Sequence, residues 1–277
     1  SDFILISPKW RVQVAEILLN GGFYAEVINT VSSLEPDDPR RIRLEITANR
    51  HLGEHEDARE IFAKASQETN QNHGVLLASI RLAWDVGEMD QVIDLSNTLL
   101  TQKPNHPIAT RFKLQALVKT GEIQQLRTVV AEIINQDASN VQALRAATDL
   151  AFSEDCDWQR TIELSDALLA IEPSDRRALC HKALALARDG FIDKSRVVLE
   201  DAKREHPENN EVDLVFAEVA RQNGDGAKQL SSVNLIFERN GYSLLNSSED
   251  NHRLNIQYLS SDPSNSVEGG QLVSVIM

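Results

Sequence analysis

Apolar residues recur three or four positions apart along most of the chain. Ala58, Phe62 and Ala65 stand at i, i+4 and i+7, which places them on one side of a helix. The same phase returns in four later segments, which begin at Val92, Leu126, Thr161 and Ser195. Further apolar and alanine-rich stretches precede these segments, at residues 42–48, 75–84 and 178–187. The pattern therefore predicts pairs of amphipathic helices that pack closely on one another.

Glycines mark a period of 34 residues between the predicted helices. They are Gly53, Gly87, Gly121, Gly190 and Gly224, and Cys156 stands where one further glycine belongs. Glycine ends a helix in the left-handed conformation at little steric cost. An acidic residue follows most of these positions, where it suits the positive end of the next helix dipole. Each glycine is thus expected to separate the first helix of a pair from the second.

Prolines form a second marker with the same period. Pro104, Pro173 and Pro207 each lie 17 residues after a glycine or after Cys156, and Ala138 fills the slot that follows Gly121. Proline cannot continue a helix, so these residues are expected to follow the end of the second helix. One pair cannot bury its apolar stripe alone, and the pairs are expected to stack.

The order of glycine, alanine, aromatic residue and alanine at Gly53, Ala58, Phe62 and Ala65 resembles the tetratricopeptide repeat family. The repeat-defining positions are Gly53, Ala58, Phe62, Ala65, Gly87, Pro104, Gly121, Pro173, Gly190, Pro207 and Gly224. The family's tryptophan and tyrosine of the first helix are mostly absent, which indicates divergent repeats. The resemblance implies an all-α fold, a right-handed superhelical solenoid of about seven helical hairpins with a short irregular or β tail.

The predicted organisation has three parts. Residues 1–39 form a divergent first hairpin, residues 40–241 form the repeats, and residues 242–277 form a linker. The repeats are expected at about 40–73, 74–107, 108–141, 142–175, 176–209 and 210–241. The linker region is rich in Ser, Asn, Asp and Pro, with one short strand expected at residues 254–259.

The C-terminal part carries a second resemblance. Residues 229–241 resemble the last repeat of bacterial proteins that join tetratricopeptide repeats to a family 2 glycosyltransferase domain, and Leu272–Met277 is similar to the first strand of that domain. The resemblance implies the non-catalytic N-terminal region of a bacterial enzyme of surface polysaccharide synthesis. The metal-binding and catalytic motifs of that family have no counterpart here. The chain as given is therefore expected to be no enzyme, and a free-standing adaptor is the alternative.

Composition narrows the range of partners. The chain has 28 basic and 42 acidic residues, so its net charge of −14 disfavours nucleic acid and anionic membranes as partners.

The sequence also lacks the features of a disulfide-rich, membrane-inserted or metal-binding protein. Two cysteines make no disulfide framework, and no apolar run is long enough for membrane insertion. Gly53 separates His51 from His55, so a shared metal site on one helix is not expected. We expect a cytoplasmic protein without metal or cofactor.

The charge is unevenly distributed between the two helices of each pair. Five windows over the first helices sum to +9, and the matching windows over the second helices sum to −10. In the tetratricopeptide repeat family the first helices line the concave face. The resemblance therefore places a basic groove at Arg40, Arg43, Arg50, Arg81, Trp84, Arg111 and Lys119. Its expected ligand is a protein or peptide, with an acidic peptide or an anionic glycan as the candidates. Solvated arginines at helix ends are the alternative interpretation, and a homodimer is one candidate assembly.

Overall fold

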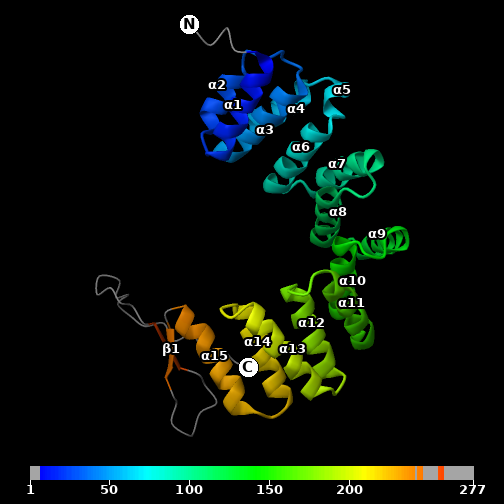
Figure 1. Ribbon diagram of the computed structural model, residues 1–277, viewed down its shortest axis with the longest axis vertical. Coiled ribbons are helices and arrows are strands. Elements are labelled where there is room, and N and C mark those ends of the chain that lie inside the picture. The colour runs from blue at the N-terminus through cyan, green and yellow to red at the C-terminus, as the bar shows by residue number, and fades with distance from the viewer. Residues whose placement is uncertain (1–6, 241, 246–254, 259–277) are drawn as a thin grey trace. The chain divides into compact units, whose positions relative to one another are not determined.

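The computed structural model describes residues 7–240, 242–245 and 255–258, and fifteen helices and two strands lie in these ranges. The chain separates into two compact units, residues 1–136 and 137–277. Each unit is a stack of helical hairpins (Figure 1). The predicted all-α solenoid of seven hairpins is confirmed, and the predicted domain boundaries stay a prediction.

Unit 1 contains four hairpins and a one-turn helix. The first helices of the hairpins are α1 (Pro8–Asn20), α3 (Pro39–Leu52), α6 (His73–Val86) and α8 (Pro107–Thr120). The second helices are α2 (Tyr24–Val31), α4 (His55–Lys64), α7 (Met89–Gln102) and α9 (Ile123–Gln136). We call the first helices the A helices and the second the B helices. The A helices contact one another in the order α1, α3, α6, α8, so they form one layer of the stack.

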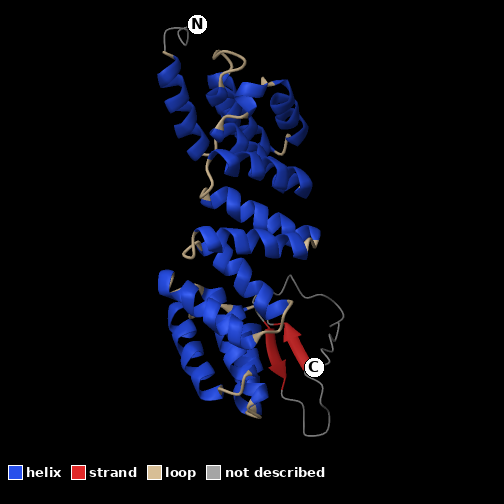
Figure 2. Ribbon diagram, turned by 90° about the vertical axis from the view of Figure 1, so that its right-hand side faces the viewer, coloured by secondary structure: helices blue, strands red, loops and turns tan. Residues whose placement is uncertain are grey.

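Unit 2 contains three hairpins followed by two short strands. Its A helices are α10 (Val141–Ser153), α12 (Arg176–Arg188) and α14 (Asn210–Gln222). Its B helices are α11 (Trp158–Ile171), α13 (Ile192–Glu205) and α15 (Gly226–Arg239). Strand β1 (Tyr242–Leu245) pairs antiparallel with β2 (Asn255–Tyr258) and contacts α15 (Figure 2). β2 confirms the strand expected at 254–259, whereas the strand predicted at Leu272–Met277 lies outside the described residues.

The periodic glycines end the A helices as predicted. Gly53, Gly87 and Gly121 are the C-caps of α3, α6 and α8, with φ between 73° and 84°. Cys156 has a φ of 51°, and no other non-glycine residue in the described ranges has a positive φ. Cys156 stands where the series has a glycine, and its backbone has the same left-handed conformation as the glycines.

The second hairpin differs from the prediction. The stripe from Ala58 to Ala65 predicts one helix, but α4 ends at Lys64 and Ala65 is extended. Ser66 then caps the one-turn helix α5 (Gln67–Asn70), and its backbone N–H donates to the Asp37 carboxylate at 2.8 Å. This cross-hairpin hydrogen bond offers the backbone an alternative to a longer α4, which local periodicity could not reveal.

Apolar side chains fill the interior of each unit. One cluster packs α1 and α2 against α3 through Ala15, Val27 and Leu44, and another packs α12 to α14. In the second cluster the buried Ser195 hydroxyl donates to the Ala183 carbonyl at 2.7 Å. The Ser165 hydroxyl on α11 is also buried but has no hydrogen-bond partner among the described residues. Buried serines in neighbouring hairpins thus differ in their hydrogen bonding.

A buried aspartate forms two ion pairs inside unit 2. Asp213 on α14 is only 2% exposed, and its two carboxylate oxygens accept from Lys203 Nζ at 2.5 Å and from Arg239 Nη1 at 2.6 Å. Lys203 belongs to α13 and Arg239 to α15, so the carboxylate joins three consecutive helices. No helix in the described ranges has both the length and the apolar character needed to cross a membrane.

Candidate functional site

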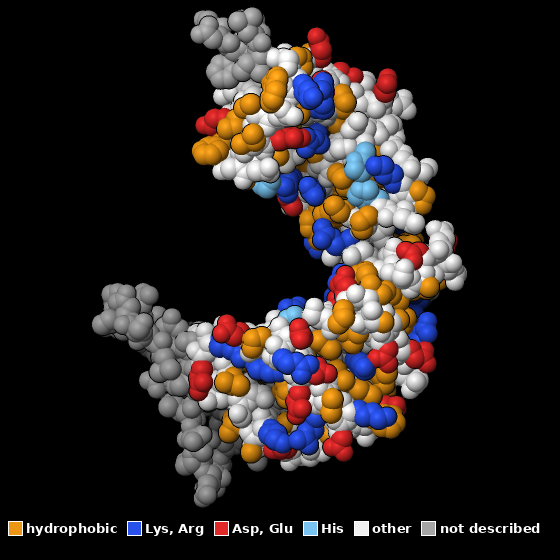
Figure 3. All heavy atoms as spheres, in the orientation of Figure 1, with side chains coloured by type: hydrophobic (Ala, Val, Ile, Leu, Met, Phe, Trp, Pro, Cys, Tyr) orange, Lys and Arg blue, Asp and Glu red, His pale blue; other side chains and the backbone are white. Residues whose placement is uncertain are grey.

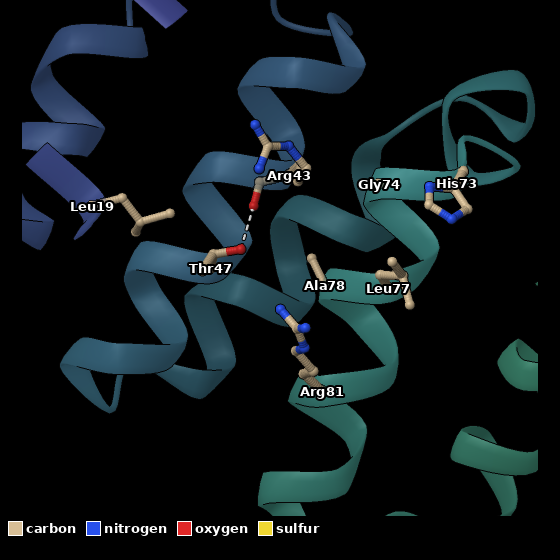
Figure 4. Close-up of a pocket in the computed structure, with 8 residues that line it drawn as sticks. All are labelled: Leu19, Arg43, Thr47, His73, Gly74, Leu77, Ala78 and Arg81. Atoms are coloured by element: carbon tan, nitrogen blue, oxygen red, sulfur yellow. Dashed lines mark hydrogen bonds between the residues drawn. The ribbon is translucent and has the colours of Figure 1, made fainter. Parts of the chain in front are cut away.

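A pocket of about 390 Å³ opens on the A-helix layer of unit 1. Its wall comes from three A helices, α1, α3 and α6 (Figure 4). The lining residues are Leu19, Arg43, Thr47, His73, Gly74, Leu77, Ala78 and Arg81. Two guanidinium groups and an imidazole therefore surround an apolar floor, which suits a ligand with both an anionic and an apolar part.

Helix geometry explains why these side chains meet. Arg43 and Thr47 are four residues apart on α3, and Leu77 and Arg81 are four apart on α6, so each pair shares one helix face. Gly74 lets the two helices approach, since a Cβ at this position would lie 2.8 Å from Arg43 Cδ. The Thr47 hydroxyl donates to the Arg43 carbonyl at 2.7 Å, which fixes the hydroxyl against its own helix.

The two arginines of the pocket differ in their partners. Arg43 Nη2 lies 2.6 Å from Glu16 Oε1 on α1, so one ion pair already satisfies part of this guanidinium. Arg81 has no acidic partner among the residues that the structure describes. Arg81 is therefore the cation in the pocket that is free to receive a ligand anion.

His73 forms the end of the pocket nearest α8. Its ring meets the ring of His106 edge to face at 4.9 Å, and its Nε2 is buried without a partner in the described part of the chain. Burial and the nearby Lys103 lower the pKa of both histidines. His106 Nδ1 accepts from the Ala109 N–H at 3.2 Å and so caps α8 as an uncharged ring.

The other predicted groove residues lie outside the pocket lining. Arg40 pairs with Asp38 at 2.6 Å at the start of α3, where the aspartate raises the pKa of the arginine. Arg50 pairs with Asp85 at 2.7 Å near the opposite end of the helix. Asp38 and Asp85 therefore partly neutralise these two arginines. The sum of charges over each first helix could not show which acidic residue pairs with which arginine.

Trp84, Arg111 and Lys119 form a second group farther along the A-helix layer. Trp84 on α6 contacts Phe112 on α8 edge to face at 5.4 Å, and Lys119 Nζ lies 3.9 Å from the Trp84 ring centre. The Arg111 guanidinium lies 5.2 Å from the Phe112 ring centre. We call these four residues the cation–aromatic cluster. The part of unit 1 visible in Figure 3 shows basic, histidine and hydrophobic side chains next to one another.

Unit 2 has a comparable cluster that the sequence analysis did not identify. Arg188 lies 4.8 Å from the Trp158 ring centre, and the Phe152 ring stacks on His181 at 4.5 Å. Burial raises the pKa of Asp149 to about 6 and lowers the pKa of His181 to about 4. The residues come from α10, α11 and α12, so no local motif could have indicated the cluster.

The remaining sequence candidates are two histidines and the two cysteines. His51 closes α3 and stacks on Tyr24 at 4.7 Å, and α4 begins at His55 beyond the helix break at Gly53. Cys156 is an exposed free thiol, and Cys180 is a buried one whose pKa burial raises to about 12. No group of three or more metal-binding side chains occurs within the described ranges.

Comparisons with known proteins agree with this architecture. A tetratricopeptide repeat protein from Parabacteroides merdae is 14% identical, with a TM-score of 0.59 over 83% of this chain and 91% of that one. The structure of PilF from Pseudomonas aeruginosa is 12% identical, with a TM-score of 0.60 over 76% of this chain and 96% of the other. No family model and no curated protein sequence matches.

A third solved structure, the APC/C hetero-tetramer Cut9–Hcn1, contains a chain with 14% identity and a TM-score of 0.60, which matches 81% of this chain and 45% of its own length. At such low identity the likeness concerns the fold alone. The chain therefore has the tetratricopeptide repeat fold.

Proposed function

We propose that the chain is a non-catalytic scaffold that binds an acidic peptide segment of a partner protein on the A-helix layer of unit 1. The observation that carries this proposal is the pocket in which the unpaired Arg81 stands beside Leu77 and Ala78. A carboxylate can pair with the guanidinium while a neighbouring apolar side chain covers the floor. The fold supports the proposal because its stacked A helices offer an extended surface for a peptide.

The cation–aromatic cluster extends the proposed surface. Trp84 lies three residues after Arg81 on α6, so both side chains occupy neighbouring turns of one helix face. Lys119 and Arg111 add two cations that have no acidic partner among the described residues. A peptide that reaches from the pocket to this cluster would meet three cations and the ring of Trp84, against which the buried Phe112 packs.

Charge reversal at Arg81 tests the proposal. The probe is a fluorescein-labelled ten-residue peptide of alternating Glu and Leu, with a Gln and Leu peptide as the neutral comparison. We expect Arg81→Glu to weaken binding of the acidic peptide at least tenfold at low salt, because an attractive contact becomes repulsive. The matched control is Arg160→Glu, an exposed arginine on α11 that lies outside the surface. Equal binding of both peptides, or unchanged binding by Arg81→Glu, contradicts the proposal.

The salt dependence gives a second readout. Binding through partly exposed charges weakens as ionic strength rises, and Arg81→Glu should reduce this slope. A uronic acid oligosaccharide serves as the competitor. If the oligosaccharide binds and the acidic peptide does not, the ligand is an anionic glycan and the peptide proposal fails.

A second candidate concerns the larger protein. Residues 229–241 and Leu272–Met277 resemble the junction between repeats and catalytic domain in bacterial family 2 glycosyltransferases. On this interpretation the scaffold recruits partners to an enzyme that follows in the same chain. The nucleotide sequence of the gene beyond Met277 provides the test: an Asp-x-Asp motif within about one hundred codons supports the candidate, and a stop codon supports the free-standing adaptor.

A further inference from the structure

The outer side of α1 is apolar and uncovered. Trp10 is 61% exposed, Val14 38% and Ile17 71%, and they lie at i, i+4 and i+7 on one stripe. The opposite side of the helix buries Val12 and Ala15 against α2 and α3. α1 therefore has two apolar stripes on opposite sides: the inner one is buried and the outer one is exposed.

The stripe continues past the end of the helix. Gly21 occupies the next position of the same stripe, and the ring of Phe23 packs against it, so that a Cβ on Gly21 would lie 2.9 Å from Phe23 Cδ2. Phe23 is itself 56% exposed. We call Trp10, Val14, Ile17 and Phe23 the α1 end face. Together they expose roughly 400 Å² of apolar surface, comparable with the largest patch of a typical monomer.

No charged residue lies within the α1 end face. At 100° per residue, Lys9, Arg11 and Glu16 point outside the stripe from Trp10 to Gly21, and Glu16 is turned toward Arg43. This matters for a chain with a net charge of −14, because two copies repel one another over most of their surface. The face is an uncharged place at which two copies can approach.

The described part of the chain leaves the α1 end face without a neighbour. In unit 2, α15 is contacted by strand β1. The outer stripe of α1 has no such contact with a described element. Its apolar surface is therefore available to a second copy.

We propose that the α1 end face binds a second copy of this chain, with two α1 helices antiparallel about a two-fold axis near Val14. In this register Trp10 of each copy lies opposite Ile17 of the other, and the two Val14 side chains meet at the axis. The basic N-terminal half of one α1 then runs beside the half of the other that carries Glu16. The helix dipoles are also antiparallel, which is favourable.

The size of the surface indicates a weak dimer. Two such faces and their polar rim bury on the order of 1,000 Å² in total, which is below the standard interface of about 1,600 Å². The dimer is therefore expected to be a reversible one.

Sedimentation velocity of the full chain between 1 and 100 μM tests the dimer. We expect the wild-type protein to shift from monomer to dimer across this range and Ile17→Glu to stay monomeric. The matched control is Val197→Glu, which places the same charge on a 59% exposed valine of α13 and should dimerise normally. Circular dichroism shows whether each variant is folded. A wild-type chain that is monomeric at 100 μM, or a dimer that Ile17→Glu does not weaken, overturns the proposal.

Crosslinking tests the register. In a Cys156→Ser background, Val14→Cys should form a covalent dimer on mild oxidation, because the two-fold axis brings the two thiols together. Val197→Cys in the same background should not. An uncrosslinked Val14→Cys under conditions in which sedimentation shows a dimer overturns the antiparallel arrangement.

Further variants distinguish a second copy from the chain's own N-terminus as the occupant of the α1 end face, and the dimer from the peptide site. Deletion of residues 1–6 should leave the dimer unchanged, whereas a gain of dimer on deletion would mean that the chain's own N-terminus covers the face. Arg81→Glu should dimerise like the wild type, and Ile17→Glu should bind the acidic peptide like the wild type. The dimer and the peptide site therefore succeed or fail separately.

Discussion

Substitution of Cys156 measures how much its left-handed backbone conformation costs in free energy of unfolding. Its φ of 51° places an L-residue with a side chain in the left-handed region that the other hairpins give to glycine. The left-handed conformation costs a non-glycine residue about 1–2 kcal/mol. Cys156 is exposed, so its replacement loses little buried surface. Cys156→Gly is therefore expected to relieve the strain and to stabilise the protein.

The expected gain is smaller than the strain itself. Glycine loses more backbone freedom on folding, which costs about 0.5–1 kcal/mol. The difference leaves a net stabilisation of about 0.5–1 kcal/mol, which corresponds to a rise in melting temperature of roughly 2–4 °C in a unit of this size. The substitution Gly190→Ala makes the reverse change at the equivalent position, where φ is 86° and the added Cβ meets no atom within 4 Å. It should destabilise by about 1 kcal/mol.

Urea denaturation followed by circular dichroism measures these differences, and amide exchange in α10 and α11 localises them. Stacked repeats can unfold in steps, so the exchange data show that the change arises beside residue 156. Cys156→Ala is the control because it removes the thiol and keeps the strained backbone. If Cys156→Ala stabilises the protein as much as Cys156→Gly, the thiol rather than the backbone conformation is responsible and the reasoning is refuted.

Three other predictions concern buried polar groups. Asp213→Asn should lower the unfolding free energy by about 2–3 kcal/mol, since it leaves two partly exposed cations facing a neutral side chain, and urea midpoints at pH 7 measure the loss. Ser165→Ala should stabilise by up to about 1 kcal/mol by removing a buried hydroxyl without a partner, whereas Ser195→Ala should destabilise by about 1 kcal/mol; the opposite signs in thermal melts distinguish the two. Stability of unit 1 should fall as the pH drops below 6.5, because the lowered histidine pKa values mean that the unfolded chain binds protons that the folded chain does not. His106→Asn, which replaces the capping Nδ1 of α8 by an amide oxygen, should reduce this pH dependence in urea midpoints compared between pH 7.5 and 5.5.

The repeat framework could be predicted from the sequence because its determinants are local. A glycine such as Gly87 ends a helix through its own φ, and a proline such as Pro104 stops one through its own ring. The position of Cys156 in the series was enough to indicate that it lies between the two helices of its pair, α10 and α11. The short helix α5 was missed because the Ser66 backbone N–H donates to the carboxylate of Asp37, which is 29 residues away in the chain.

The candidate site was only partly predictable for the same reason. The repeat register indicated that Arg43 and Arg81 lie on the first helices of their pairs, and both line one pocket; that this pocket binds a ligand stays a prediction. The register could not reveal that Glu16 on another helix pairs with Arg43. Leu19 and His73 joined the pocket only through the packing of α1 and α6 around α3, which no local pattern encodes.

The last helix has a consequence for the order in which the chain unravels. α15 has five large apolar residues but no side chain that is fully buried, whereas the neighbouring α14 buries six residues. In a repeat stack each hairpin is stabilised by its neighbours, so opening begins where a helix has the weakest interface. Amide protons of α15 should therefore exchange before those of α14, and a protease should cut within α15 before it cuts within α14.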